Sequence, residues 1–306
     1  MPLTLYCKRI ANNNMNKLFL FGATVIVLFS SCQKETPETV SMDIRERVSN
    51  QPGITPVPAV FTKNTLLEQF TDVTDGEAPM NALNTELIQR TFPGRVSVAN
   101  LHLSDVMAIT HGSRVLQNLG STNTAAVATI NRKSFAGTTF LDGTRWANAV
   151  DGELRKPADC GLAINSKVSN KTATVWVVAG FNTNANSPRN VTAYLIEDMV
   201  SSNGINFAQA NNHNIVPSSP FFNQGNPINN FTHANVVRRV LTGTLGNSIN
   251  PASMVNGGSG TFTFKFDVPE RTGNSTWKIV AFISDATSKE VLNVQEATLG
   301  TLKNWN

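Results

Sequence analysis

Charged residues are scarce in this chain. Only 15% of its 306 residues are Asp, Glu, Lys or Arg, against about 25% in a typical soluble domain. Three cysteines in so long a chain exclude a small disulfide-stapled scaffold. Neither is the chain globally disordered, because an apolar fraction of 41% and 17 phenylalanines bury enough surface to offset the ordering entropy. The length fits one large domain or two ordinary ones.

Motifs of common catalytic and metal sites are also missing. The histidines show neither H-x-x-x-H nor H-E-x-x-H spacing; they are His102, His111, His213 and His233. No G-x-S-x-G elbow, Walker loop or G-x-G-x-x-G follows a strand in the right context. We therefore expect no cofactor, no metal and no enzymatic activity, and we interpret His102 and His233 as structural.

The N-terminus has the pattern of a cleaved export signal. An apolar run over residues 18–29 is too short to span a membrane as a helix, and it ends in small residues before Cys32. Basic residues precede it: Lys8, Arg9 and Lys17. The small residues before Cys32 resemble a bacterial lipobox, which predicts cleavage of residues 1–31 and lipidation of Cys32. A plain secretory signal is the alternative, and Met15 is a second candidate start.

Cleavage changes both the charge and the cysteine count. The whole chain has 25 basic and 21 acidic residues, a net of +4, and the signal contains three of the basic ones and no acidic one. The mature chain is thus near +1, and we expect no nucleic-acid partner. With Cys7 removed and Cys32 lipidated, Cys160 stands alone, forms no intrachain disulfide and is expected to pack as a small apolar residue.

The segment after the lipidation site reads as a tether. Residues 32–60 are polar and interrupted by prolines, which is typical of a flexible linker. Lys34-Glu35 resembles the signal that sends lipoproteins of Bacteroidota-type bacteria to the outer face of the outer membrane. We therefore expect an acyl (palmitate) anchor in the outer membrane and a surface-exposed body.

The rest of the chain divides into two patterns at about residue 157. The first part alternates strand patterns with helical ones, which favours an α/β unit. Its expected strands are 64–70, 95–103 and 125–130, and its expected helices begin at Pro79 and cover 106–119 and 144–154. The second part is rich in β-branched and aromatic runs separated by Asn, Gly, Ser and Pro, which favours a β-sandwich. Its expected strands are 172–179, 191–196, 260–266 and 277–283.

The segment from Leu66 to Pro79 reads LLEQFTDVTDGEAP. It resembles the family of twenty-eight-kilodalton outer-membrane-protein-related lipoproteins of Bacteroidota, which typically reads L-x-E-x-F-T-G-x-x-C-x-x-C-P here. Later stretches in the family's order extend the likeness over most of residues 61–299; they are 195–198, 233–243 and 277–283. The resemblance implies an α+β protein with a thioredoxin-like domain at 61–157, followed by an immunoglobulin-like β-sandwich at 158–303.

Two departures from the family pattern bear on the chemistry. The family's two cysteines are replaced by Asp75 and Ala78, ahead of Pro79, so the nucleophilic and the resolving thiol are both missing. The strand that would carry a cis-proline opposite the dithiol, residues 125–132, has no proline. We expect a degenerate domain retained as a scaffold, without thiol–disulfide activity.

Other polar pairs allow a functional and an ordinary interpretation. Asp75 and Glu77 could act as acid and base, but the helix dipole should keep both ionised, and capping is the favoured interpretation. Glu197-Asp198 could contribute to a calcium site, but adjacent strand residues point to opposite faces, so a strand-end pair is favoured. Arg238-Arg239 is too short to form a basic patch.

The expected function is a non-enzymatic interaction or adhesion role at the cell surface. A long polar loop, residues 204–231, carries four phenylalanines that suit contact with a host or bacterial protein or a glycan: Phe207, Phe221, Phe222 and Phe231. They could equally fold the loop back onto the sandwich. The alternatives are a protein related to a thiol–disulfide oxidoreductase, or its partner, and an accessory glycan-binding lipoprotein.

Overall fold

A computed structural model describes residues 53–306 except 122–125 and 202–204. The predicted signal peptide, Cys32 and most of the tether lie outside these residues. The helices are α1 (Ala78–Thr91), α2 (Thr110–Asn118) and α3 (Trp146–Leu154). The strands are β1 (Thr65–Thr71), β2 (Val96–His102), β3 (Val127–Ile130), β4 (Cys160–Ser169), β5 (Thr172–Phe181), β6 (Arg189–Asp198), β7 (Val236–Val240), β8 (Asn247–Ser248), β9 (Ser259–Asp267), β10 (Thr276–Asp285), β11 (Val291–Thr298) and β12 (Leu302–Lys303). Within the described ranges, no helix has the length and apolar character needed to cross a membrane.

The strands form two sheets. The larger has eight strands in the order β11-β10-β6-β7-β2-β1-β3, with β8 paired to β6, and the smaller has the order β12-β4-β5-β9. Strands β1 and β2 are parallel over their whole lengths, whereas β2 meets β7 through the single parallel pair Asn100–Val236. The large sheet is therefore continuous from the first described strand to β11.

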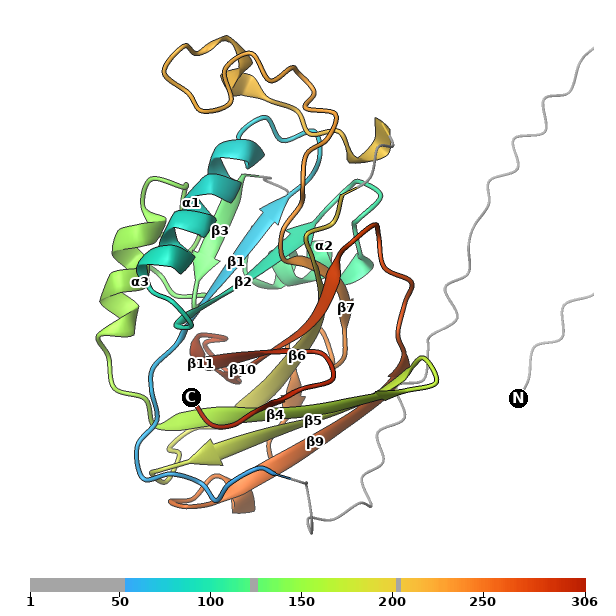
Figure 1. Cartoon of the computed structure of the whole chain (residues 1–306). Helices are drawn as coiled ribbons and strands as arrows, with labels where there is room; N and C mark the ends of the chain where they lie inside the picture. The colour runs from blue at the N-terminus through green and yellow to red at the C-terminus, as the bar shows by residue number, and fades with distance from the viewer. Residues whose placement is uncertain (1–52, 122–125, 202–204) are drawn as a thin grey trace, which may run out of the picture. The chain divides into compact units, whose positions relative to one another are not determined.

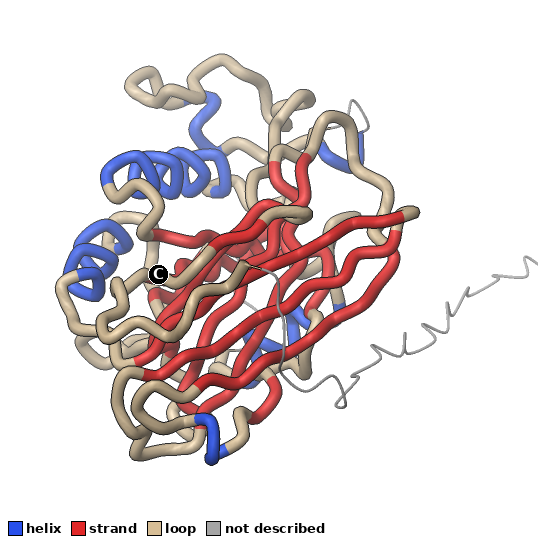
Figure 2. Tube along the Cα trace, turned by 60° about the horizontal axis from the view of Figure 1, so that its bottom comes forward, coloured by secondary structure: helices blue, strands red, loops and turns tan. Residues whose placement is uncertain are grey.

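Helices or strands pack against both faces of the large sheet. On one face, α1 and α3 pack over β1, β2 and β3, and the small sheet packs over β6 and β10, so helices and sheet share that face (Figure 1). On the other face, α2 packs against β1 and β2. Figure 2 shows the strands running through the middle of this body with helices at its margins. Buried apolar side chains on both faces supply most of the folding free energy.

The mixed α/β character predicted from the sequence is confirmed, and β4, β7 and β11 were not expected. Strands from both sides of the predicted boundary at residue 157 share the large sheet, because β2 hydrogen-bonds to β7: Asn100 N donates to Asn235 O at 2.8 Å and Asn100 Nδ2 to Ala234 O at 2.7 Å. A thioredoxin-like unit followed by an immunoglobulin-like sandwich, and the boundaries given to them, stay predictions.

The helix predicted over 106–119 is shorter in the structure. It begins at Thr110, because the Asp105 carboxylate accepts the backbone N–H groups of Met107 and Val73 and holds this stretch as a loop. An aspartate that bonds nearby backbone groups competes with helix formation in this way. Helix α1 begins close to its predicted start, with Pro79 in its first turn, where its missing N–H costs no helical hydrogen bond.

A fully buried ion pair joins the two halves of the large sheet. Arg132, just after β3, donates to both carboxylate oxygens of Glu68 on β1, at 2.6 and 2.8 Å. The Tyr194 hydroxyl on β6 donates to Glu68 at 2.9 Å and accepts from Arg132 at 3.0 Å, and the Arg132 guanidinium lies 4.8 Å from the centre of the Phe282 ring on β10. The Glu68 and Arg132 side chains are both 0% exposed. Burial acts to lower the Arg132 pKa, but the Glu68 carboxylate outweighs it and raises the pKa, so the guanidinium stays charged.

Replacing Glu68 by alanine should therefore destabilise the protein by about 3–5 kcal/mol, because it leaves the Arg132 charge buried and unpaired. Chemical denaturation measures this change. The matched control is Glu86→Ala, which breaks an exposed pair with Arg90 and should cost less than about 1 kcal/mol. A double variant, Glu68→Leu with Arg132→Met, should regain part of the loss. Equal stability of Glu68→Ala and the wild type would contradict the role assigned to the pair.

Candidate functional site

The positions of the missing dithiol lie at the carboxyl ends of the parallel strands β1 and β2. Ligands of open α/β sheets commonly bind at this edge. Residues 72–77 connect β1 to α1, and Ala78 and Pro79 open the helix. The structure thus places Asp75, Ala78 and Pro79 together at the α1 N-terminus, as the resemblance implies for a redox centre.

The Asp75 carboxylate is hydrogen-bonded to its own loop and is largely shielded from solvent. Its Oδ1 accepts the Glu77 N–H at 3.0 Å, and its Oδ2 lies 3.4 Å from the Thr71 hydroxyl. Burial raises the pKa of Asp75 against these hydrogen bonds. Desolvation thus shifts the Asp75 pKa against the direction in which the helix dipole would shift it, and the expectation that both carboxylates stay ionised remains a prediction. Glu77, the N-cap residue, makes no side-chain cap hydrogen bond.

A buried histidine–carboxylate pair lies beside this loop. His102, the last residue of β2, donates from Nδ1 to Asp105 Oδ2 at 2.6 Å, and both side chains are buried. Burial acts to raise the Asp105 pKa, but the hydrogen bonds from His102 and from the backbone of Met107 and Val73 outweigh it and lower the pKa. Asp105 therefore ties the loop after β2 to the loop after β1.

Residues 205–231, here called the cover loop, close the site from above; they form the gold segment at the top of Figure 1. Gln209 donates from Nε2 to the carbonyls of Asp75 at 2.7 Å and Val73 at 3.1 Å. Asn212 N donates to Gly76 O at 3.0 Å, and a Cβ at Gly76 would lie 2.2 Å from the Asn212 side chain. Any side chain at position 76 would thus displace the Asn212 side chain of the cover loop.

The outer side of this contact is a hydrogen bond between a histidine and a carboxylate. His213 Nε2 lies 2.9 Å from Glu77 Oε2, and Asn212 Nδ2 donates to Glu77 Oε1 at 3.2 Å. The hydrogen bond from His213 lowers the Glu77 pKa. Beneath the cover loop, Asp75 is 9% and Ala78 7% exposed. The cavity left there is about 20 Å³, enough for about one water molecule.

The second buried histidine, His233, lies between the cover loop and β7. His233 donates from Nε2 to the Phe207 carbonyl at 2.9 Å, and its ring centre lies 5.6 Å from that of His102. Burial lowers the His233 pKa to about 4, so it is neutral at pH 7. The structural interpretation of His102 and His233 accounts for their contacts, but the sequence did not indicate that they touch.

The other candidate groups lie elsewhere. Glu197 accepts the Thr272 N–H and the Ser275 hydroxyl, whereas Asp198 pairs with Lys278 at 2.9 Å, so the two carboxylates of this strand end serve different partners. Across the described ranges, no three His, Cys, Asp or Glu side chains are arranged to hold a metal ion.

The remaining cysteine and arginine candidates fill ordinary roles. Cys160 is buried and free, as expected for a small apolar residue, and burial raises its pKa to about 12. Arg238 lies 3.5 Å from Glu197, and Arg239 stacks over the Phe266 ring. Helix α2 carries His111. Cys32, the predicted lipidation site, lies outside the described residues.

Several residues of the site carry no signal in the sequence. Gln209, Asn212 and His213 belong to an amide-rich loop more than 130 residues away from the residues they touch. Their polarity indicates hydrogen bonding, but only the tertiary structure shows the partner. The phenylalanines of the cover loop mostly turn inward; among the four, only Phe222 is exposed.

The family model described as outer membrane protein Omp28 matches residues 115–303, more than half of the chain. The chain belongs to this family of outer membrane proteins. That membership confirms the resemblance found from the sequence. The matched region begins within α2 and includes the small sheet, the cover loop and the strands of the large sheet other than β1 and β2. The residues that close the site therefore lie inside the family region, whereas Asp75 and Ala78 precede it.

Two solved structures are similar to this chain at low sequence identity. HBP35 of Porphyromonas gingivalis is 16% identical, with a TM-score of 0.57 over 78% of this chain and 76% of that chain. A structural-genomics target protein from Agrobacterium tumefaciens is 12% identical, with a TM-score of 0.46 over 77% of this chain and 93% of that chain. No curated protein matches the sequence. The likeness to HBP35 supports the fold.

The buried neutral His233 should make stability depend on pH. Its pKa is about 4 in the folded state and about 6.5 when unfolded, so the unfolded chain binds more protons and stability falls as pH drops from 6.5 towards 4. Denaturant titrations at pH 7 and pH 5 should differ by about 2 kcal/mol from this group. The titratable neighbours of His233 are His102 and Asp105.

His233→Gln is the test variant, because it keeps a hydrogen-bond donor without a proton to gain. Its stability should change less between pH 7 and pH 5 than that of the wild type. The same loss in both proteins would show that other groups cause the pH dependence.

Proposed function

We propose that this member of the Omp28 family is a lipid-anchored, surface-exposed outer membrane protein with a non-enzymatic role, which binds a protein partner through its cover loop. One observation carries the proposal: the positions that a dithiol would occupy hold Asp75 and Ala78, and the cover loop buries both. The structural core of a redox fold is thus used as a platform for a loop.

Thiol–disulfide exchange needs an exposed thiolate near a helix N-terminus. Here a carboxylate with a raised pKa and a methyl group take those positions, and Gln209 seals the loop above them. Cys160, on β4, is fully buried, and its pKa is raised to about 12. These features support a role without redox chemistry.

The cover loop presents apolar side chains on a firmly hydrogen-bonded frame. Asn211 Nδ2 donates to the carbonyls of Phe221 and Gly225, both at 3.0 Å, and Asn223 N donates to Asn214 O at 3.0 Å. These bonds bring the two arms of the loop tip together. Its tip (Ile215, Val216 and Phe222) is exposed by 81%, 38% and 38%.

Such a preorganised apolar tip suits a protein partner, because binding would cost little ordering entropy. A glycan is the second candidate, since amide side chains surround the tip. Sugar faces usually pack on aromatic rings, however, and the tip exposes one aromatic ring beside two aliphatic side chains. The exposed side chains of the loop tip therefore favour a protein partner over a glycan.

The loop-tip proposal is tested with purified residues 33–306 on immobilised host matrix proteins, fibronectin and collagen, with an albumin surface as reference. Ile215→Ser with Phe222→Ser should weaken matrix binding at least about tenfold, as truncating central contacts does. Val168→Ser, an exposed change on β4, is the matched control and should bind normally. Wild-type binding no stronger than to albumin would contradict the proposal, and binding to a glycan array alone would favour the second candidate.

Purified mature protein should reduce insulin disulfides no faster than the buffer with dithiothreitol alone. The physical reason is the absence of a thiol at the α1 N-terminus and the burial of Cys160. Clear turnover would overturn the non-enzymatic assignment.

Lipid attachment is tested by metabolic labelling with palmitate. The wild-type chain should take up the label, and Cys32→Ala should lose it. Proteinase treatment of intact cells should digest the labelled protein. Labelled protein that resists the proteinase would refute surface exposure and retain the anchor.

A further inference from the structure

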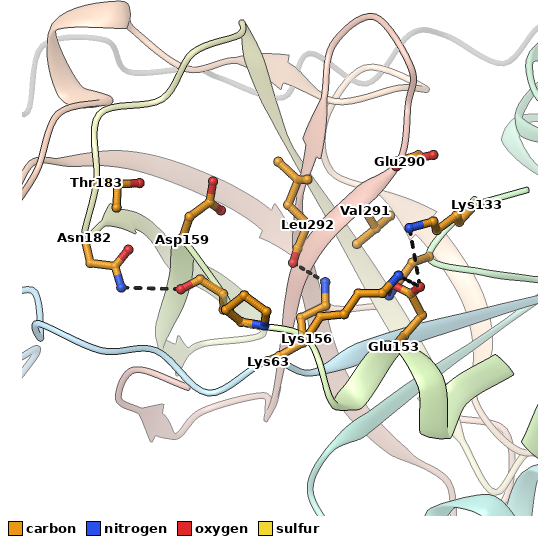
Figure 3. A pocket seen from close by; sticks show the side chains of 13 residues that line it. Lys63, Lys133, Glu153, Lys156, Asp159, Asn182, Thr183, Glu290, Val291 and Leu292 are labelled. Carbon is orange, nitrogen blue, oxygen red and sulfur yellow. Dashed lines mark hydrogen bonds and ion pairs between the residues drawn. The ribbon is translucent and has the colours of Figure 1, made fainter. Parts of the chain in front are cut away.

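A second, larger cavity opens on the other side of the molecule from the cover loop's contacts. Its volume is about 600 Å³, within the range of small-molecule sites. Figure 3 shows its walls, which come from the segment before β1, from the end of α3 and from the start of β11. Residues from both halves of the chain thus meet at one hollow, which is a common place for ligand sites.

Lys63 is the unusual residue of this cavity. Its side chain belongs to a residue that is only 7% exposed, and burial lowers its pKa. The ammonium group donates to the Leu292 carbonyl, the one hydrogen-bond acceptor that the described residues give it. An ammonium has three donors, and a buried charge is costly unless it is paired. Lys63 therefore lies buried without an ion-pair partner among the described residues.

Two more lysine side chains, those of Lys133 and Lys156, lie at the same end of the cavity. Lys156 bonds to Glu153, and Lys133 lies 3.6 Å from the same Glu153 oxygen. Burial acts to raise the Glu153 pKa, but the hydrogen bonds from Lys156 and Asn131 outweigh it and lower the pKa. The Glu153 carboxylate thus pairs with two lysines and bonds to Asn131, and no ion pair joins it to Lys63 among the described residues.

The other acids do not cancel this positive charge. Asp159, at the far end of Figure 3, is held by Arg189 through two hydrogen bonds at 3.0 and 2.7 Å. Glu290, on the rim, acts on Lys156. In and around the cavity there are four basic groups, three lysines and Arg189, and three acidic groups, Glu153, Asp159 and Glu290. The formal net charge of these groups is therefore +1.

The polar wall near Asp159 offers hydrogen bonds to an uncharged part of a ligand. Asn182 donates to the carbonyls of Ala158 and Ala59, and its buried Oδ1 has no donor among the described residues. Thr183 adds a hydroxyl to the same wall. A molecule with hydroxyl groups would satisfy this end.

We propose that this cavity binds a small anion that carries hydroxyl groups, a sugar acid or a sugar phosphate, with the Lys63 ammonium as the main contact of the anionic group and Lys133 and Lys156 as its neighbours. The shared chemistry is a carboxylate or phosphate oxygen that takes the unused Lys63 donors. This site is independent of the cover loop and of the proposed protein partner.

Titration calorimetry on residues 33–306 tests this with three probes of similar size: glucuronate, glucose 6-phosphate and glucose. At least one anionic probe should bind, and glucose should not, because it lacks the charge. The two anionic probes separate a carboxylate ligand from a phosphate ligand. Affinity should fall as salt rises, since part of it comes from screened charges. Equal affinity for all three probes, or no binding of any of them, would overturn the proposal.

Lys63→Met is the test variant and Lys167→Met, an exposed change on β4, is its matched control. Lys63→Met should weaken binding of the anionic probe at least roughly tenfold. Lys167→Met should leave that binding unchanged. Thermal unfolding without ligand distinguishes a ligand-binding role of Lys63 from a structural one. If Lys63 serves only the ligand, replacing this buried, unpaired group should not lower the unfolding midpoint temperature. A Lys63→Met protein that is less stable yet binds the probe normally would show that Lys63 serves the fold and would overturn the site.

Discussion

The buried ion pair of Glu68 and Arg132 connects strands that are far apart in the sequence. Two charges removed from water are costly, and this cost is offset only when every oxygen and most donors find partners. Here the Tyr194 hydroxyl bonds to both partners and the Phe282 ring packs on the guanidinium, whereas Arg132 Nη1 has no hydrogen-bond partner among the described residues. Because these partners come from β1, β6 and β10 and from the end of β3, the large sheet has to assemble as one piece to satisfy the pair.

That continuous sheet explains why the site after β1 is closed. With β7 held beside β2, the chain that leads into β7 crosses the carboxyl ends of the parallel strands, and the cover loop lies over Asp75 and Ala78. Carboxylate, amide and imidazole groups then satisfy one another where thiols would need access. The same assembly forms the hollow around Lys63 at another edge, where residues from both halves meet.

Much of the fold follows from local signals. The alternating apolar patterns predicted β1, β2 and β10, and Pro79 indicated the start of α1, because these preferences act over a few residues. Helix α2 was predicted too long, because the Asp105 carboxylate competes for backbone N–H groups. The raised pKa of Asp75 was not foreseen for a related reason: the helix dipole is a local property, whereas desolvation depends on what covers the residue.

The sequence by itself determined the membership of the family, the mixed α/β class and the absence of a dithiol at positions 75 and 78, since all three depend on residue identity and short-range pattern. Only the tertiary structure decided that Gln209 and His213 close that site, that His102 touches His233, and that Lys63 is buried without a carboxylate. The reason is physical: burial and hydrogen-bond partners are set by residues more than 100 positions away, and a single sequence does not encode which distant groups meet.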